Sequence, residues 1–338
     1  MAESNPITQA MQSAVEAGVF PGAVLLVRVG GRLHYHRAFG HAALIPSREP
    51  ASLDTVYDLA SLTKPLATTT AILCLLQEGR FGLDDPLTAV LDELKGCAIG
   101  EATAAQLLSH SSGLPGWRPF YERIAERDLA QPGFLGSAEA GSLVLELIGQ
   151  EALLAPIGTR ALYSDLGFML LGAMVERLAD CSLARFVRDC VYTALAAEPL
   201  FFIRTGGDKS KGLGGLPVDL HRVAPTEEDA WRGRVLRAEV HDENAYAMGG
   251  VAGHSGLFGT ASAVLAVSGC WLNGYLGRES LLRSDWVRRF TSRQDRPPGS
   301  SWGLGWDTPS APSSSGTRFS SRSFGHLGYT GTSLWVDP

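Results

Sequence analysis

Residues 59–67 read Leu-Ala-Ser-Leu-Thr-Lys-Pro-Leu-Ala, and the Ser61-Leu62-Thr63-Lys64 segment inside them predicts where a central helix begins. Proline is tolerated in the first helical turn, where its missing N–H needs no partner. Pro65 therefore places a helix start within a few residues of Ser61, and helical sequence continues over residues 64–80 with Gly79 as the stop. Ser61 and Lys64, three positions apart, share one face of that helix.

This position suits a serine nucleophile. N–H groups are unpaired at a helix start and the dipole there is positive, so the backbone can stabilise an oxyanion and favours a neutral Lys64 amine. The apolar neighbours of Lys64 also desolvate it, which lowers its pKa. A neutral amine beside the Ser61 hydroxyl is a general base. The plain alternative, an N-cap serine and a surface lysine, fits the spacing alone better, because four-residue motifs recur by chance.

Tyr163-Ser164-Asp165 precedes a second predicted helix, over residues 165–179. Ser164 is its natural N-cap, so Tyr163 projects from a loop at the helix start. A tyrosine there could carry a proton to a leaving group. The alternative is a packing tyrosine with a structural hydroxyl.

His326-Leu327-Gly328-Tyr329 lies in strand-like sequence. Gly328 has no side chain, so a ligand could lie against the strand edge there. A free N–H of that edge could complete an oxyanion hole, with His326 flanking the site. The alternative is a glycine-rich strand with a solvated histidine.

The rest of the chain changes character twice. Two strand-like runs, 22–29 and 32–39, flank Gly30-Gly31, which predicts a hairpin. Helical sequence rich in Ala and Leu then extends to about residue 200, and strand-like sequence resumes at 324–336.

This order predicts an α+β fold built from both ends of the chain. A sheet domain would combine residues 1–60 and 240–338. A mainly helical domain would be inserted over residues 61–239, with the nucleophile helix at the interface.

The composition bounds the class of protein. The 338 residues are 45% hydrophobic and 19% charged, enough apolar material for a full core. A net charge of −6 without a basic run disfavours nucleic acid as a partner, and no stretch approaches the ~20 apolar residues of a membrane span. The first 20 residues contain neither Lys, Arg nor an apolar block, so we expect no signal peptide and a cytoplasmic location. The sequence carries no indication of oligomeric state.

Cofactor motifs are missing as well. The five scattered cysteines contain no CxxC and predict reduced core thiols. We find no HExxH, GxGxxG, P-loop or GxSxG, which counts against metalloprotease, dinucleotide, nucleotide and α/β-hydrolase functions. Neither metal nor organic cofactor is expected, because the proposed chemistry needs only side chains and water.

In order and context, the three motifs resemble those of the serine β-lactamase-related family: class C β-lactamases, D,D-peptidases and family VIII-type esterases. Ser61–Lys64 is similar to the family's Ser-x-x-Lys, and Tyr163–Asp165 to its Tyr-x-Asn with aspartate in place of asparagine. His326–Gly328 is similar to its Lys-Thr-Gly in the His-x-Gly form. The connecting segments at residues 21–23, 107–115 and 255–260 also resemble those of the family. Residues 240–258 resemble its penicillin-binding-protein-4B-like subgroup.

The resemblance implies an antiparallel sheet flanked by helices plus an all-helical domain, with the active site between them. Family members continue beyond the position of Pro338 with further strands and a helix, so the resemblance implies that these elements are missing from this sequence. It also implies that Ser61 attacks a carbonyl with help from Lys64 and Tyr163. The N–H groups of Ser61 and Tyr329 would hold the oxyanion, and water would hydrolyse the acyl-enzyme. Whether the lysine or the tyrosine is the acylation base stays open.

Three functions follow from the resemblance. The leading one is a serine hydrolase, an esterase or peptidase acting on a small ester or amide, including one derived from the cell wall. Asp165, which can pair with Lys64 and keep it protonated, motivates the alternative of a catalytically silent binding homologue. A true β-lactamase is the third, and His326 counts against it, because a mostly neutral histidine replaces a lysine that helps hold the drug's carboxylate.

Overall fold

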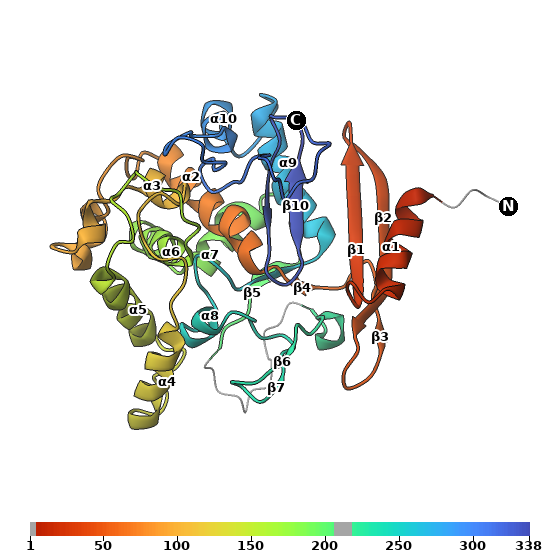
Figure 1. The fold of residues 1–338 in the computed structure, drawn as a ribbon, viewed down its shortest axis with the longest axis horizontal. Helices are drawn as coiled ribbons and strands as arrows, with labels where there is room; N and C mark the ends of the chain where they lie inside the picture. Colours follow the sequence, from red (N-terminus) through yellow and green to blue (C-terminus); the bar gives the residue numbers. More distant parts are fainter. Residues whose placement is uncertain (1–4, 206–217) are drawn as a thin grey trace.

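The computed structural model describes residues 5–205 and 218–338, and there the strands form small antiparallel sheets, with most of the helices on one side of the N-terminal hairpin (Figure 1). Helix α1 (Pro6–Glu16) precedes a hairpin of β1 (Gly22–Val29) and β2 (Arg32–Ala43), with β3 (Glu49–Pro50) on the outer edge of β2. The hairpin prediction is confirmed: Gly30 and Gly31 have φ of 55° and 81°, the left-handed values that a two-residue turn of this kind requires.

The predicted central helix is confirmed, with an irregular first half. It runs from the 3-10 turn η1 (Ala60–Leu62) through the π-helical η2 (Lys64–Thr69) into α2 (Thr70–Gln77), and Gly79 follows with φ of 68°. Residues 62–76 are all buried. This helical run is therefore the centre of the core, and its first turn carries Ser61.

Two long helices contact this run. Helix α6 (Asp165–Ala179), the second predicted helix, packs on α2, and α9 (Ala261–Tyr275) packs on η2. The Trp271 indole N–H donates to Thr70 Oγ1 at 3.0 Å. The run lies at the junction between the helices of the middle of the chain and the C-terminal segment (Figure 1).

Two strand pairs bring distant segments to Ser61. Strand β8 (Leu257–Gly259) pairs with β5 (Leu200–Phe202) and with β4 (Tyr57–Asp58), which lies just before Ser61. The predicted C-terminal strands are confirmed as the hairpin of β9 (Phe324–Leu327) and β10 (Ser333–Val336), and β9 contacts η1.

The other described elements surround this centre. Strands β6 (Glu228–Asp229) and β7 (Arg234–Val235) form a small pair. The remaining helices are α3 (Ala104–Leu108), α4 (Phe120–Ala130), α5 (Ala138–Gln150), α7 (Leu183–Val187), α8 (Glu243–Ala247) and α10 (Ser284–Thr291), with the short turns η3 (Leu87–Ala89), η4 (Asp92–Leu94), η5 (Ala98–Glu101), η6 (Arg188–Tyr192) and η8 (Leu220–Arg222). The mixture confirms the predicted α+β class, whereas the division into two domains stays a prediction.

Two further expectations can be compared with the structure. All five cysteines are free, but only Cys74 and Cys270 are buried; Cys97 and Cys181 are half-buried and Cys190 is exposed, so a core position was wrong for three of them. No helix in the described ranges combines the length and apolar character that a bilayer crossing requires.

Candidate active site

The backbone just before Ser61 is held in an unusual conformation. Ala60 has φ of 46°, a left-handed value that costs an L residue about 1 kcal/mol. The Asp58 carboxylate accepts the Ala60 N–H at 2.8 Å and the His241 N–H at 2.7 Å. Burial raises the pKa of Asp58 to about 6. This carboxylate therefore fixes the approach to Ser61 and ties it to the segment around His241.

The Lys64 side chain is completely buried and makes three hydrogen bonds. Its ammonium donates to Ser61 Oγ at 2.9 Å, to Asp165 Oδ1 at 2.6 Å and to the His254 backbone oxygen at 3.1 Å. An ammonium has three N–H donors, so all are used. The predicted contact between Ser61 and Lys64 is confirmed. The alternative of a surface lysine is wrong, because the Lys64 side chain is buried.

The protonation of Lys64 differs from the prediction made from the helix start. Burial acts to lower the pKa of Lys64, but the Asp165 carboxylate and the Tyr163 phenol outweigh it, so the pKa is raised above its ordinary value. The prediction of a neutral amine considered only the dipole and apolar neighbours and is wrong for the resting site. The expectation that Asp165 pairs with Lys64 and keeps it protonated is confirmed.

Tyr163 and Asp165 flank the N-cap of α6. The Ser164 hydroxyl accepts an N–H from the first turn, which confirms the predicted cap. This start brings both neighbours to Lys64, whose Nζ lies 4.9 Å from the centre of the Tyr163 ring. Burial raises the pKa of Tyr163 above its ordinary value, although Lys64 and Ser61 act to lower it. The phenol is therefore protonated at neutral pH.

His110 is a site residue that the sequence analysis missed. It is buried, and its Nδ1 accepts the Ser164 N–H at 3.1 Å. Its ring lies 4.5 Å from that of Tyr163 and 4.4 Å from that of Trp302. Burial holds the pKa of His110 well below 6.5, so the imidazole is neutral. The only sequence signal for His110 was its position within residues 107–115, a connecting segment that resembles the family.

His326 is buried, not solvated. Its ring lies 6.0 Å from that of Tyr163, beside Trp302. Burial, with a contribution from the Lys64 charge, lowers the pKa of His326 to about 3. The predicted neutral histidine at the flank of the site is confirmed, and its neutrality comes from burial.

Gly328 has a packing role that its sequence context did not predict. A Cβ at this position would lie 2.0 Å from Thr332 Oγ1 and 2.6 Å from the Leu59 carbonyl oxygen. Thr332 Oγ1 donates to that oxygen at 3.0 Å. The missing side chain therefore lets the β9–β10 turn pack against the chain leading to Ser61. Protein atoms fill the space that a side chain would take here, and the prediction that a ligand lies against the strand edge at Gly328 stays a prediction.

The turn after Gly328 contains Tyr329, whose N–H is the second oxyanion donor that the family resemblance implies. Thr330 Oγ1 donates to the Asp58 carbonyl oxygen at 2.7 Å, which fixes the turn to the segment before Ser61. The N–H groups of Tyr329 and Ser61 donate to no acceptor within residues 5–205 and 218–338. The Tyr329 side chain is 84% exposed and its ring lies 5.3 Å from that of His241.

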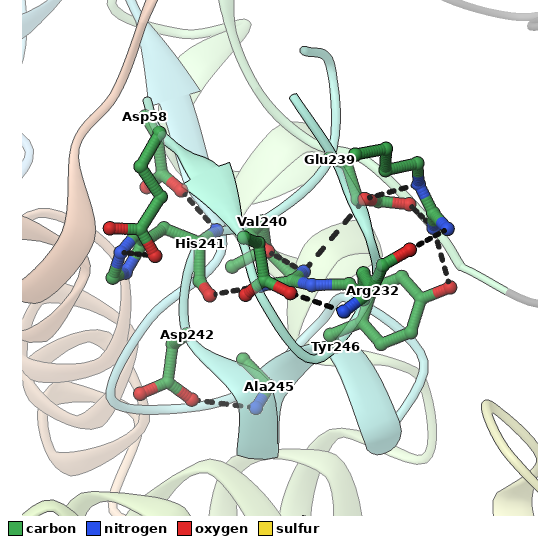
Figure 2. A network of polar contacts seen from close by, with 11 residues as sticks. Asp58, Arg232, Glu239, Val240, His241, Asp242, Ala245 and Tyr246 are labelled. Carbon is green, nitrogen blue, oxygen red and sulfur yellow. Dashed lines mark hydrogen bonds and ion pairs between the residues drawn. The ribbon is translucent and has the colours of Figure 1, made fainter. Parts of the chain in front are cut away.

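A buried arginine organises the segment around His241 (Figure 2). Arg232 donates to the backbone oxygens of Val240 at 2.7 Å and His241 at 2.6 Å. Asp242 then caps α8, and its Oδ1 accepts a hydrogen bond from His254 Nε2 at 2.8 Å. Burial acts to raise the pKa of Asp242, but His254 outweighs it and the pKa falls to about 2. The network thus holds His254, whose backbone oxygen accepts a hydrogen bond from the Lys64 ammonium.

The structure therefore gathers the predicted residues at one place. The side chains in mutual contact or beside one another are those of Ser61, Lys64, Tyr163, Asp165 and His326, whereas Gly328 and Tyr329 belong to a turn that is hydrogen-bonded to the segment before Ser61. In the part of the chain that the structure describes, no group of three or more His, Cys, Asp or Glu is placed to hold a metal ion.

Comparisons with known proteins agree with this geometry. The profile of the family described as Beta-lactamase matches residues 7–338. Among curated proteins, one from Escherichia coli O157:H7 with the provisional name D-alanyl-D-alanine carboxypeptidase is 30% identical over an alignment of 367 residues, covering 99% of this chain and 79% of that protein. A protein of the same name from Salmonella typhi is 29% identical over 353 residues and covers 97% and 78%.

Solved structures share the fold. The structure titled "EstCE1, a hydrolase with promiscuous acyltransferase activity" has a TM-score of 0.73 at 22% identity, covering 98% of this chain and 89% of that one. A class C beta lactamase from Rhodobacter sphaeroides has a TM-score of 0.64 at 20% identity, covering 90% and 75%. The family match over nearly the whole sequence and the shared fold agree, and the chain belongs to the beta-lactamase family of serine hydrolases.

Proposed function

We propose that Ser61 is the nucleophile of a serine acyl hydrolase, which attacks the carbonyl carbon of a small ester or amide and forms an acyl-enzyme. The observation that carries this proposal is the 2.9 Å hydrogen bond from the buried Lys64 ammonium to Ser61 Oγ. A fully buried lysine is costly to maintain unless it has a specific partner set, and here one partner is a half-exposed hydroxyl. That hydroxyl is the group a substrate can reach.

Two backbone N–H groups support an oxyanion site. The N–H of Ser61 and that of Tyr329 have no acceptor among the described residues, and the β9–β10 turn is fixed to the segment before Ser61 by two threonine hydroxyls. Preorganised N–H donors of this kind are worth roughly 3 kcal/mol each to a developing oxyanion. Together they would hold the carbonyl oxygen as it becomes negative.

The proton of Ser61 needs a path, because Lys64 is already an ammonium at rest. In the proposed step the Oγ–C bond forms while the hydroxyl proton enters the group formed by Lys64, Tyr163 and Asp165. Lys64 can accept it only by passing one of its own protons to Asp165, 2.6 Å away. Either Lys64 or Tyr163 can take the Ser61 proton first, and Tyr163, a protonated phenol at rest, must then pass its own proton through Lys64 to Asp165. The same proton protonates the leaving alcohol or amine, and water then cleaves the acyl-enzyme by the reverse path.

The names of similar proteins and the neutrality of His326 together support a class of substrate. Relatives named as D-alanyl-D-alanine carboxypeptidases and a hydrolase of the same fold support an ester or amide substrate, including one derived from the cell wall. The neutral, buried His326 disfavours a β-lactam, whose carboxylate needs a cation.

The test is labelling with a fluorophosphonate probe, followed by peptide mapping. We expect one adduct, on Ser61, and none in Ser61→Ala. Ser142→Ala, which changes an exposed serine on α5, is the matched control and should label like the parent protein. A burst of p-nitrophenol from an activated ester should accompany labelling.

A folded protein that takes no label and gives no burst would contradict the proposal and favour the silent binding homologue. Rapid opening of a chromogenic cephalosporin would instead favour the β-lactamase alternative.

A further inference from the structure

Among residues 5–205 and 218–338, the side chains of the site are bound by one cation, and the protein itself uses all of its donors. Lys64 is the only lysine or arginine in these ranges that makes a hydrogen bond, ion pair or cation–π contact with Ser61, Tyr163 or Asp165, and its three N–H donors are all used inside the protein. The two imidazoles beside Tyr163, those of His110 and His326, are neutral because burial lowers the pKa of each. A carboxylate on the substrate would therefore lose its water without gaining a charge partner.

Asp165 presents the opposite charge. Only its Oδ1 is bound to Lys64, and Oδ2 makes no hydrogen bond to any described residue. The Asp165 side chain is 17% exposed, whereas that of Lys64 is 0% exposed, so part of the Asp165 side chain is open to solvent and the ammonium is not. The residue is also in the first turn of α6, where the helix dipole favours a negative charge.

The distance from the nucleophile sets what this carboxylate can bind. The Lys64 ammonium bridges Ser61 Oγ and Asp165 Oδ1 at 2.9 and 2.6 Å, which caps the separation of the two oxygens at about 5.5 Å. In an acyl group bonded to Oγ, an amine on the α-carbon is three bonds away, at roughly 3 Å. When that amine points toward Asp165, at most about 2.5 Å of the separation remains, so the amine comes within hydrogen-bond distance of the carboxylate.

We propose that Asp165 recognises an ammonium group on the acyl part of the substrate, so that the preferred acyl donors are aminoacyl esters and amides with a free α-amino group. This inference rests on the proposed function and specifies its substrate class. Asp165 also pairs with Lys64, so a change at Asp165 alters every reaction of the site. The quantity that isolates recognition is a ratio between two substrates on the same enzyme.

The experiment compares alanine p-nitroanilide, in both enantiomers, with propionyl p-nitroanilide, which lacks only the amine. At pH 6.5 we expect kcat/KM to be about 10- to 100-fold higher for one alanine enantiomer, the range of a hydrogen bond to a charged group. In Asp165→Asn the ratio should fall to near the value set by the electronic effect of the amine alone. Asp165→Glu, which keeps the charge, should retain part of the preference.

A second measurement uses the unmodified chain, in case Asp165→Asn does not fold. Alaninamide should protect Ser61 from the fluorophosphonate at pH 6.5 better than propionamide does. The protection should weaken as the pH passes ~8, where the α-amino group loses its charge.

The outcomes separate the two proposals. Labelling of Ser61 and hydrolysis of the propionyl substrate without any preference for the amine, or a preference that Asp165→Asn leaves unchanged, would overturn the role of Asp165 alone. Equal protection by alaninamide and propionamide would do the same. A chain that takes no label and cleaves neither substrate would overturn the hydrolase proposal itself.

Discussion

Replacing Asp58 with asparagine should change how the free energy of unfolding depends on pH. Burial raises the pKa of Asp58 from 3.8 to about 6, so the fold favours the protonated carboxyl group. Its contribution to stability is therefore complete below pH 3.8 and is lost as the pH rises through about 6. A shift of this size corresponds to about 3 kcal/mol. Asparagine does not titrate, so its variant lacks this loss.

The measurement is urea unfolding of both proteins at pH 4, 5, 6 and 7. The free energy of unfolding of the parent protein minus that of Asp58→Asn should fall by about 3 kcal/mol across this range. Other titrating groups occur in both proteins and cancel in the difference. Asp54→Asn, at a side chain that is 80% exposed, is the control and should show a flat difference.

A difference that stays constant within about 1 kcal/mol, or that rises with pH, would refute the reasoning. It would mean that the N–H groups of Ala60 and His241 stabilise the charged carboxylate enough to offset its burial. The ionised Asp58 carboxylate would then be more stable in the folded protein than in the unfolded chain, and this charged group would fix the segment before Ser61.

Two further predictions concern residues around the site. Gly328→Ala should lower the free energy of unfolding by about 1–3 kcal/mol and slow labelling of Ser61, because its Cβ would lie 2.0 Å from Thr332 Oγ1. The control is Gly141→Ala on α5, where a Cβ meets nothing within 4 Å, and it should be neutral or stabilising in the same urea assay. Equal effects of the two changes would count against the packing argument. Asp242→Asn should cost about 2 kcal/mol at pH 7, because the pKa of Asp242 is lowered to about 2; this loss should be constant above pH 4 and shrink as the pH falls toward 2, and unfolding measurements that show no such trend would contradict it.

Local sequence rules were enough for the elements and for the nucleophile pair. Pro65 and the three-residue spacing placed Ser61 and Lys64 on one helical start, and Ser164 placed the start of α6. Each of these features is decided within one or two helical turns, where capping and proline geometry act. The hairpin around Gly30-Gly31 belongs to the same category.

What the sequence did not predict depends on contacts between distant segments. The protonation of Lys64 is set by a partner 101 positions away, and the role of Gly328 by the carbonyl oxygen of Leu59. The neutrality of His326 comes from its burial beside Tyr163 and Trp302, which no spacing indicates. The sequence therefore shows which side chains can react and which protonation states are open to Lys64, and contacts between distant segments decide between those states.

Because all three N–H donors of Lys64 are used, the chemical reactivity of this amine also reports how often the site opens. Reagents that methylate or acylate amines need a free, exposed nitrogen, and Lys64 offers none while its three hydrogen bonds are intact. Lys95, with a side chain 66% exposed, reacts in the closed fold and supplies the reference rate. The ratio of the two rates, followed by mass spectrometry, measures how often the centre of the molecule opens without unfolding, and a bound substrate that closes the site further would slow Lys64 alone.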